Sequence, residues 1–434
     1  MEKMVKLNSN FRKFEGRPYL FAGVANKAKE FNKAHPGVLI RLGIGDATES
    51  IHPLITSYLA EASLRLSHLD GYDKEEMKSS EMKKALHEAG FDKFNGYGDE
   101  QGNELLRKRI NEIKYGGRFS LDEIFISDGA KCDTANIQQI FSQDAIVALQ
   151  NPAYPVYEGS NVIAGRTGKA NPATGEFDGL VYMPCTPAND FQPSVPNRRI
   201  DIEYLGSPNN PTGTTIWRST AQAHVDNALA QKAIIVSDCA YERYIKDERD
   251  MHSIYEIPGA EKCAIEIGSF SKEAGFTGMR LGWCVVPKTL QTEDSDDKFN
   301  ANWIWNKRQT TEFNGAANLI QAAGLAVMSP GGQRVTQGLI NFYMENARLE
   351  REAMKSLGLK VYGGKSAPYV WVRLPEGRKS VEFADAFLNE EPHIVCTPGS
   401  GFGSAGEGYI RLSAYGHREN ILRATERLGK LVLK

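Results

Sequence analysis

The sequence predicts an α/β protein in which a large domain with a mostly parallel central sheet is followed by a smaller α+β domain. From residue 124 onward, short β-rich runs alternate with segments that could form helices. The strand parts of these runs are almost continuously apolar, as expected for strands that are buried on both faces. After about residue 330 this pattern gives way to a long amphipathic segment and a few short strands. With 434 residues, 41% of them hydrophobic, the chain can bury two cores.

Six runs predict the strands of the large sheet: EIFISDGAK, AIVALQNPAYP, DIEYLGSPNNPTG, AIIVSDCAYERY, CAIEIGSFSK and RLGWCVVP. Polar and reactive residues follow the apolar part of most of these runs. Ligands of open α/β sheets bind beyond the carboxyl ends of the strands. We therefore expect one crevice to collect Lys131, Tyr154, Asn210, Asp238, Tyr241, Ser269, Ser271 and Lys272.

The C-terminal part predicts the elements of a second domain. A Gly-Pro break at SPGGQ precedes a long amphipathic helix, and KVYGGKSAPYVWVRLP follows as a pair of strands. SVEFADAFLN predicts a helix, GYIRLSAYG a strand and RENILRATERLGKLVLK a closing helix. We expect residues 1–48 to form an N-terminal arm and part of the small domain, 49–329 the large domain and 330–434 the small C-terminal domain.

Charge and composition exclude several classes of function. Lys and Arg total 52 against 54 Asp and Glu, and the sequence contains no cluster of basic residues that could bind along a phosphate backbone. Nucleic acid is therefore not expected as a partner. The six cysteines form no C-x-x-C pair and the eight histidines no i, i+4 pair, which disfavours a metal site and a disulfide framework. No apolar leader or bilayer-spanning run is present, so no membrane partner is expected. We expect a cytoplasmic protein, or a plastid-stromal one if a transit peptide has been removed.

The stretch SFSKEAGFTGMRLGW places Lys272 and Arg280 close together among small and apolar residues. Taken alone, the stretch is also typical of a solvated surface segment. If Lys272 is buried beside another cation, burial and like-charge repulsion lower its pKa, and the neutral amine can condense with an aldehyde. A cofactor of the pyridoxal type needs such a lysine, an acid for its pyridine nitrogen and a phosphate cradle.

The remaining parts of such a site are present at other strand ends. Asp238 could supply the acid, and the backbone N–H groups of Ala130 and Lys131 could face a phosphate where a strand passes into a helix. Ser269, Ser271 and Arg280 would add hydroxyl and guanidinium donors. Each feature alone also fits a helix cap or an ordinary turn. Their joint occurrence at the ends of strands in one sheet favours a pyridoxal-phosphate site.

These motifs resemble a known family. GSPNNPTG, SDCAYERY, SFSKEAGFTGMRLGW and YIRLSAYG are similar to the motifs of fold type I pyridoxal 5′-phosphate aminotransferases. LGIGD, GYGDEQG, SDGAKCD and NPAYPVY resemble the LL-diaminopimelate aminotransferases within that family, and the similarity runs from about residue 5 to the C-terminus. The resemblance implies a homodimer with shared active sites and pyridoxal 5′-phosphate in the large domain. It implies the interconversion of tetrahydrodipicolinate plus glutamate and LL-2,6-diaminopimelate plus 2-oxoglutarate, in lysine biosynthesis.

The resemblance also implies a role for each site residue. Lys272 would hold the cofactor and move the substrate proton, and Asp238 would pair with the pyridinium nitrogen. Asn210 and Tyr241 would bind the phenolic oxygen, and Tyr154 would stack on the ring. The phosphate would be held by Ala130, Lys131, Ser269, Ser271, Arg280 and, from the neighbouring subunit, Tyr97. Lys272, Asp238 and Tyr241 would form the catalytic group.

The resemblance also implies which residues contact the substrate, although the residues taken alone allow other interpretations. Arg411 would bind the α-carboxylate as a bidentate pair, although its alternating run also fits a surface strand. Glu100 would receive the distal ammonium group of diaminopimelate, although the residue taken alone favours a solvated turn carboxylate. The other implied substrate contacts are Tyr19, Gly45, Lys131, Tyr154, Asn210 and Asn314. The lysine- and glutamate-rich segment 74–94, which precedes Tyr97, departs from the family pattern and is expected to be a solvated helix or loop.

Three rival functions remain. Ser269 and Lys272 satisfy the S-x-x-K motif of penicillin-binding proteins and class A β-lactamases, but their S-D-N and K-T-G motifs are missing. A cofactor-binding regulator without catalysis would need an additional module for DNA or a partner, for which the chain has no obvious room. An aspartate-like or aromatic aminotransferase of the same fold is the closest alternative.

Overall fold

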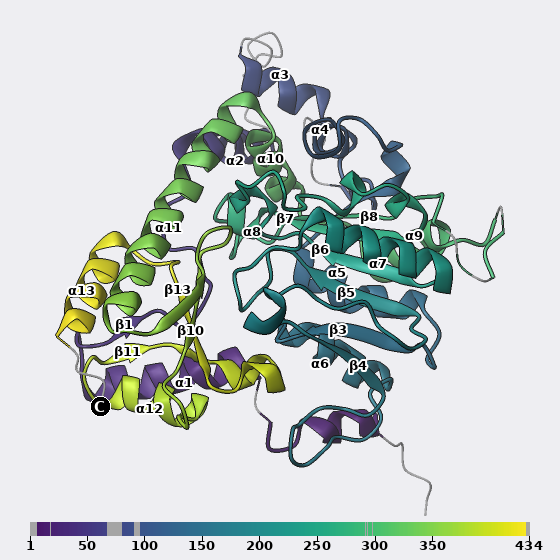
Figure 1. The fold of residues 1–434 in the computed structure, drawn as a ribbon. Coiled ribbons are helices and arrows are strands. Elements are labelled where there is room, and N and C mark those ends of the chain that lie inside the picture. Colours follow the sequence, from purple (N-terminus) through teal and green to yellow (C-terminus); the bar gives the residue numbers. More distant parts are fainter. Residues whose placement is uncertain are drawn as a thin grey trace, which may run out of the picture.

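The computed structural model describes residues 7–17, 19–66, 80–90, 96–290, 292, 294–296 and 298–430. Its largest element is a seven-stranded sheet with the strand order β2-β8-β7-β6-β5-β3-β4 (Figure 1). The strands are β2 (Ile124–Ser127), β3 (Val147–Asn151), β4 (Leu180–Pro184), β5 (Ile202–Gly206), β6 (Ile234–Asp238), β7 (Ala264–Ser269) and β8 (Gly282–Val285). All six predicted runs form strands, and the predicted α/β fold class is confirmed.

The sheet is parallel except for β8, which is antiparallel to both of its neighbours, β2 and β7. This reversal matters for the site, because the N-terminal end of β8 lies at the same edge as the carboxyl end of β7. Ser269 pairs there with Gly282. Arg280, two residues before β8, therefore reaches the edge that carries Lys272. The edge strand β4, with the run LVYMP, was not among the predicted strands, and it is only partly buried.

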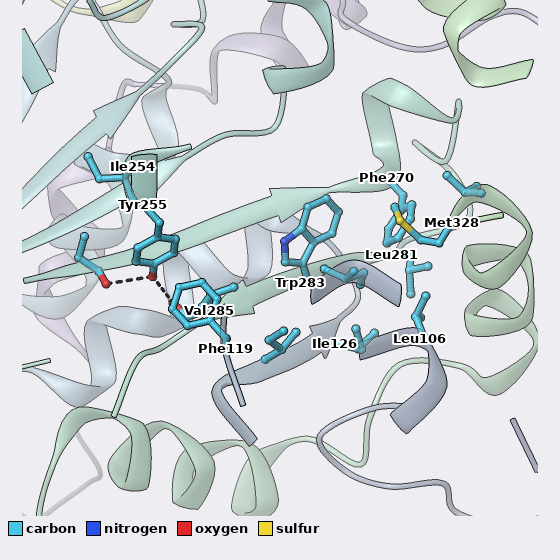
Figure 2. Close-up of a cluster of buried hydrophobic side chains, with 14 of the residues drawn as sticks. Leu106, Phe119, Ile126, Ile254, Tyr255, Phe270, Leu281, Trp283, Val285 and Met328 are labelled. Carbon is cyan, nitrogen blue, oxygen red and sulfur yellow. Dashed lines mark hydrogen bonds between the residues drawn. The ribbon is translucent and has the colours of Figure 1, made fainter. Parts of the chain in front are cut away.

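Helices cover both faces of this sheet (Figure 1). The side chains of each strand alternate between two cores: Ile126, Trp283 and Val285 face one, and Phe125 and Cys284 face the other. Figure 2 shows the first core, in which the Tyr255 hydroxyl donates to the carbonyl of Val285 (3.1 Å). This core is covered by α2 (Pro53–Leu66), α4 (Glu104–Tyr115), α7 (Arg218–Gln231) and α10 (Asn318–Val327), and the other by α5 (Ala130–Asn136), α6 (Pro155–Ala164) and α9 (Ala301–Glu312).

The C-terminal part forms a four-stranded antiparallel sheet in the order β12-β13-β10-β9. Its strands are β9 (Lys360–Gly363), β10 (Tyr369–Arg373), β12 (Thr397–Pro398) and β13 (Tyr409–Ser413). The predicted helices are α11 (Pro330–Ser356), α12 (Ser380–Asn389) and α13 (Arg418–Gly429). The predicted break separates α10, which ends at Val327, from α11, and Pro330 is the first residue of α11, where its missing N–H is tolerated.

The N-terminal segment packs on these C-terminal elements. β1 (Ile40–Arg41) pairs in parallel with β11 (Ile394–Val395), and α1 (Leu20–Ala34) buries Val24 and Phe31 against Leu388. The domain division at residues 48 and 329 stays a prediction. Of the charged segment 74–94, only α3 (Glu81–Glu88) and the residues flanking it are described, and the rest lies outside the described residues.

Short 3-10 turns complete the structure: η1 (Ser9–Phe14), η3 (Leu121–Glu123), η4 (Ile137–Ile140), η5 (Pro187–Asn189), η6 (Glu242–Tyr244), η7 (Ile254–Glu256), η8 (Ala260–Lys262), η9 (Gly399–Phe402) and η10 (Ser404–Gly406), together with the one-turn helix α8 (Phe270–Glu273). Within the described ranges, none of the helices has the length and apolar character required to cross a bilayer.

The contact of Gly213 with the small sheet provides a test of how the two sheets are joined. Gly213 has φ +64°, and a Cβ there would lie 2.5 Å from the carbonyl oxygen of Tyr369. Gly175 has φ +77° with open space around it. We expect Gly175→Ala to lower the free energy of unfolding by about 1–2 kcal/mol and Gly213→Ala by about 3 kcal/mol or more, measured by urea denaturation. Equal losses would show that the contact with Tyr369 is not tight.

Candidate active site

A cavity of about 550 Å³ lies at the carboxyl edge of the parallel strands, between the large sheet and the small one. It brings together most of the residues that the sequence predicted. The predicted residues that line it are Tyr19, Gly45, Ala130, Lys131, Tyr154, Asn210, Asp238, Tyr241, Ser269, Ser271, Lys272, Arg280 and Arg411. The expectation of a single crevice at the strand ends is therefore confirmed.

Lys272 enters the cavity from α8, the single turn that follows β7. The Ser269 hydroxyl caps this turn by accepting a hydrogen bond from the Ser271 amide (3.1 Å). The Lys272 amine donates to the carbonyl of Gly45 and lies 4.9 Å from the centre of the Tyr415 ring. Burial lowers the pKa of Lys272, and the charges of Arg411 and Arg280 act in the same direction, while Tyr369 and Asp46 oppose them. The amine is thus more readily available in its neutral, nucleophilic form than an exposed lysine is.

Asp238 ends β6 and has two hydrogen-bond donors. The Tyr157 hydroxyl donates to its Oδ2 (2.7 Å) and the amide of Ala240 to its Oδ1 (3.1 Å). Burial raises the pKa of Asp238, while both hydrogen bonds act in the opposite direction. No lysine or arginine in the described ranges forms an ion pair with this carboxylate. A cationic nitrogen placed in the cavity would therefore be its natural charge partner.

Donors for an anion gather between β2 and β8. Gly129 has φ +121°, and a Cβ there would lie 2.3 Å from the guanidinium of Arg280, so only glycine permits this close approach. The first amides of α5 follow directly, at Ala130 and Lys131. The Arg280 guanidinium donates to the carbonyl of Thr277 (2.9 Å) and lies 3.5 Å from the Ser271 hydroxyl. Amide, hydroxyl and guanidinium donors in this arrangement suit a phosphate group.

Arg411 comes from β13 in the small sheet and is completely buried. Its guanidinium donates to Asn210 Oδ1 (2.6 Å) and to the carbonyl of Gly43 (2.7 Å), and its Nε has no partner among the described residues. Its central carbon lies 4.4 Å from the centre of the Tyr369 ring. Burial lowers the pKa of Arg411. The alternative of a surface strand residue is therefore wrong, and this buried cation can receive a carboxylate.

Several residues of the cavity were missed by sequence reasoning. Tyr157 could have been found, because it lies one helical turn after Tyr154. Tyr369 and Phe21 had no such local signal, because they come from β10 and α1. The Tyr369 and Tyr241 hydroxyls lie 2.8 Å apart, so Tyr369 fixes the phenol of Tyr241.

Tyr97, Glu100 and Asn314 do not line the cavity. Tyr97 is 86% exposed, which fits the expectation that it serves a neighbouring subunit but does not test it. Gly315, next to Asn314, packs on the backbone of Glu100, so these two predicted residues lie near one another. By contrast, Lys131 and Tyr19 meet within the cavity, where the Lys131 amine donates to the Tyr19 hydroxyl (3.2 Å).

Comparisons with known proteins agree with this arrangement. The family model "Aminotransferase class I and II" matches residues 69–428, and members of this family generally depend on pyridoxal phosphate. L,L-diaminopimelate aminotransferase from Chlamydomonas reinhardtii is 42% identical over 99% of both chains, with a TM-score of 0.88. Substrate-bound BacF from Bacillus subtilis is 26% identical over 99% of both chains, with a TM-score of 0.78.

More distant solved structures share the fold. Aspartate aminotransferase from Thermus thermophilus is 20% identical over 98% of this chain and 100% of its own, with a TM-score of 0.76. The family match covers most of the chain and includes the residues from Ala130 to Arg411 that line the cavity. The chain belongs to the aminotransferase class I and II family and is a transaminase.

Proposed function

We propose that this transaminase interconverts tetrahydrodipicolinate plus glutamate and LL-2,6-diaminopimelate plus 2-oxoglutarate, in the lysine biosynthesis of the cytoplasm or plastid stroma. The observation that carries the proposal is that Lys272, Asp238 and Arg411 face one cavity and, among the described residues, have no charged partner of opposite sign in hydrogen-bond contact. A cofactor and an amino-acid substrate would bring the missing charges. The 42% identity to a diaminopimelate enzyme supports this substrate over aspartate or an aromatic amino acid.

The residues present fit pyridoxal 5′-phosphate. Lys272 would hold its aldehyde carbon, and the donors around Gly129 and Arg280 would hold its phosphate. Asp238, fixed by Tyr157, would keep the pyridine nitrogen protonated. When bound, the cofactor supplies an electron sink that weakens the bonds of the substrate α-carbon. Tyr154 would cover its ring, with Asn210 and Tyr241 near its phenolic oxygen.

The protein's own residues would then orient the substrate and move its proton. Arg411 would bind the α-carboxylate, which supplies the counter-charge that the guanidinium lacks. This contact would turn the Cα–H bond toward Lys272, whose neutral amine can take the proton and return it. The aromatic rings of Tyr369 and Phe21 around Arg411 exclude water and hold the guanidinium plane.

Substrate choice would depend on a second copy of the chain. We place the exposed loop with Tyr97 and Glu100 at the mouth of the neighbouring subunit's cavity in a homodimer. Tyr97 would then reach the phosphate there and Glu100 the distal ammonium of diaminopimelate. Asn314 would support this loop, and Tyr19, Gly45 and Lys131 would line the substrate's path from the chain's own side.

Lys272→Ala should reduce transamination to the background rate, because both the attachment of the cofactor and the proton transfer use the same amine. The wild-type protein should purify yellow, and the variant should lose the absorbance that belongs to the lysine-bound cofactor. Lys262→Ala, at an exposed lysine before β7, is the matched control and should retain activity and colour. Normal transamination by Lys272→Ala would contradict the assignment.

Arg411→Lys should lose about 2 kcal/mol or more of transition-state stabilisation, which lowers kcat/KM roughly thirty-fold. A lysine supplies a single point of contact and cannot hold both carboxylate oxygens in one plane. Steady-state kinetics would measure the loss, with Arg373→Lys on the neighbouring strand β10 as a control that should have no effect, since Arg373 is exposed. Unchanged kinetics of Arg411→Lys would place the carboxylate site elsewhere.

Glu100→Gln should weaken the reaction of LL-diaminopimelate by about 1.5–3 kcal/mol, roughly ten- to a hundred-fold. Glutamate carries no distal amine, so its half-reaction should change little. The two half-reactions can be followed separately by absorbance, and Glu104→Gln, at the exposed start of α4, serves as the control. Equal losses on both substrates would remove Glu100 from the specificity site without affecting the transaminase assignment.

A further inference from the structure

A buried cluster of charges lies next to Lys272 but outside the cavity. Its members, which we call the Lys114 cluster, are Lys114, Glu242, Arg243 and Glu273. The Lys114 amine at the end of α4 contacts the carboxylates of both Glu242 and Glu273, the latter at 2.8 Å. Arg243 Nε lies 3.6 Å from Glu273. The side chains of Lys114 and Glu273 are only 8% and 2% exposed.

The cluster does not belong to the site described above. None of its members lines the cavity of Lys272. Lys114, Glu242 and Arg243 line a second cavity of about 640 Å³, which has no lining residue in common with the first. No step of the proposed reaction uses these groups, so their burial needs another explanation.

The cluster joins the two segments that carry the reactive residues. Glu273 follows Lys272 directly, and η6 (Glu242–Tyr244) follows Tyr241 directly. All three residues of η6 are linked to α8. Glu242 is linked through Lys114, which contacts both Glu242 and Glu273, and Arg243 lies near Glu273 directly. The Tyr244 hydroxyl donates a hydrogen bond to the Lys272 carbonyl (2.8 Å). The loop after β6 and the turn after β7 are therefore held together on the side away from the cavity.

The turn α8 needs this support. It has four residues, and one turn of helix cannot hold its own geometry by internal hydrogen bonds. Arg243 also donates to the side chain and the carbonyl of Gln333 at the start of α11, which anchors the cluster to the longest helix. Glu242 and Glu273 raise the pKa of Lys114 although burial acts against this, so the amine stays charged between them.

We propose that Lys114 is a positioning residue that fixes Lys272 relative to Asp238 and Tyr241. The inference rests on the proposed function, in which Lys272 must meet both the cofactor and the substrate α-carbon. Without Lys114, the carboxylates of Glu242 and Glu273 would lose the cation that lies between them, and their repulsion would push α8 away from η6. A displacement of Lys272 by about 1 Å is enough to slow a reaction up to a hundred-fold.

The test compares Lys114→Met with the double variant Lys114→Met/Glu273→Gln. We expect Lys114→Met to lower kcat roughly ten- to a hundred-fold with little change in KM, and the double variant, in which the repulsion is removed, to recover most of the loss. The second readout is independent of transamination. In cofactor-free protein, the rate at which an amine reagent labels Lys272, located by mass spectrometry, should change at least about three-fold in Lys114→Met, while the labelling rate of exposed Lys262 does not change.

The control is His224→Gln. His224 and Glu203 form a fully buried pair at 2.7 Å that does not line the cavity of Lys272. This variant should lower the melting temperature and leave both kcat and Lys272 labelling unchanged. If Lys114→Met does not fold, Lys114→Gln, which also removes the cation from between the two carboxylates, carries the test with the same two readouts.

A folded Lys114→Met that keeps wild-type kcat and wild-type Lys272 labelling would overturn the proposal, as would a double variant without recovery. If the wild-type protein itself does not transaminate, the proposed function fails, while the labelling rates still decide whether Lys114 positions Lys272.

Discussion

The structure depends on two cations, the partly buried Lys272 and the fully buried Arg411, that face one cavity and form no ion pair with any described residue. Desolvation of an unpaired charge is expensive, and here it lowers the pKa of both groups. Among the described residues, Arg411 is held by the oxygens of Asn210, Gly43 and Thr397 and by aromatic rings. The fold maintains this arrangement because rigid elements from both sheets surround it. An anionic ligand with an aldehyde group would give both cations a partner, since the aldehyde can react with Lys272 and a carboxylate can pair with Arg411.

The two sheets contribute different halves of this arrangement. The large sheet brings Asp238 and Lys272 to one edge, and the reversed strand β8 adds Arg280 there. The small sheet contributes Arg411 and Tyr369 from the neighbouring strands β13 and β10. Behind the edge, the Lys114 cluster ties the segments after β6 and β7 together. The side chains in the cavity are thus held by hydrogen bonds within the site. The segments that carry them are held by the ion pairs of the Lys114 cluster outside the cavity.

Much of this could be predicted from the sequence, because strand runs that are buried on both faces give a strong signal and the reactive residues follow them directly. Lys272 and Asp238 were found in this way. The burial of Arg411 could not be decided from an alternating run, since the same pattern fits an exposed strand. Tyr369 gave no signal because only the packing of β10 against the large sheet brings it to the site. The proposed role of Glu100 would depend on a second chain, which no pattern within one chain describes.

The most direct test of the central claim is a single-substrate half-reaction. The yellow, cofactor-loaded protein is mixed with one amino acid at a time, and the loss of its visible absorbance is followed by stopped flow. We expect LL-diaminopimelate and glutamate to remove this absorbance, and aspartate and aromatic amino acids at the same concentration to remove it far more slowly. Faster loss with aspartate or an aromatic amino acid than with LL-diaminopimelate would contradict this expectation.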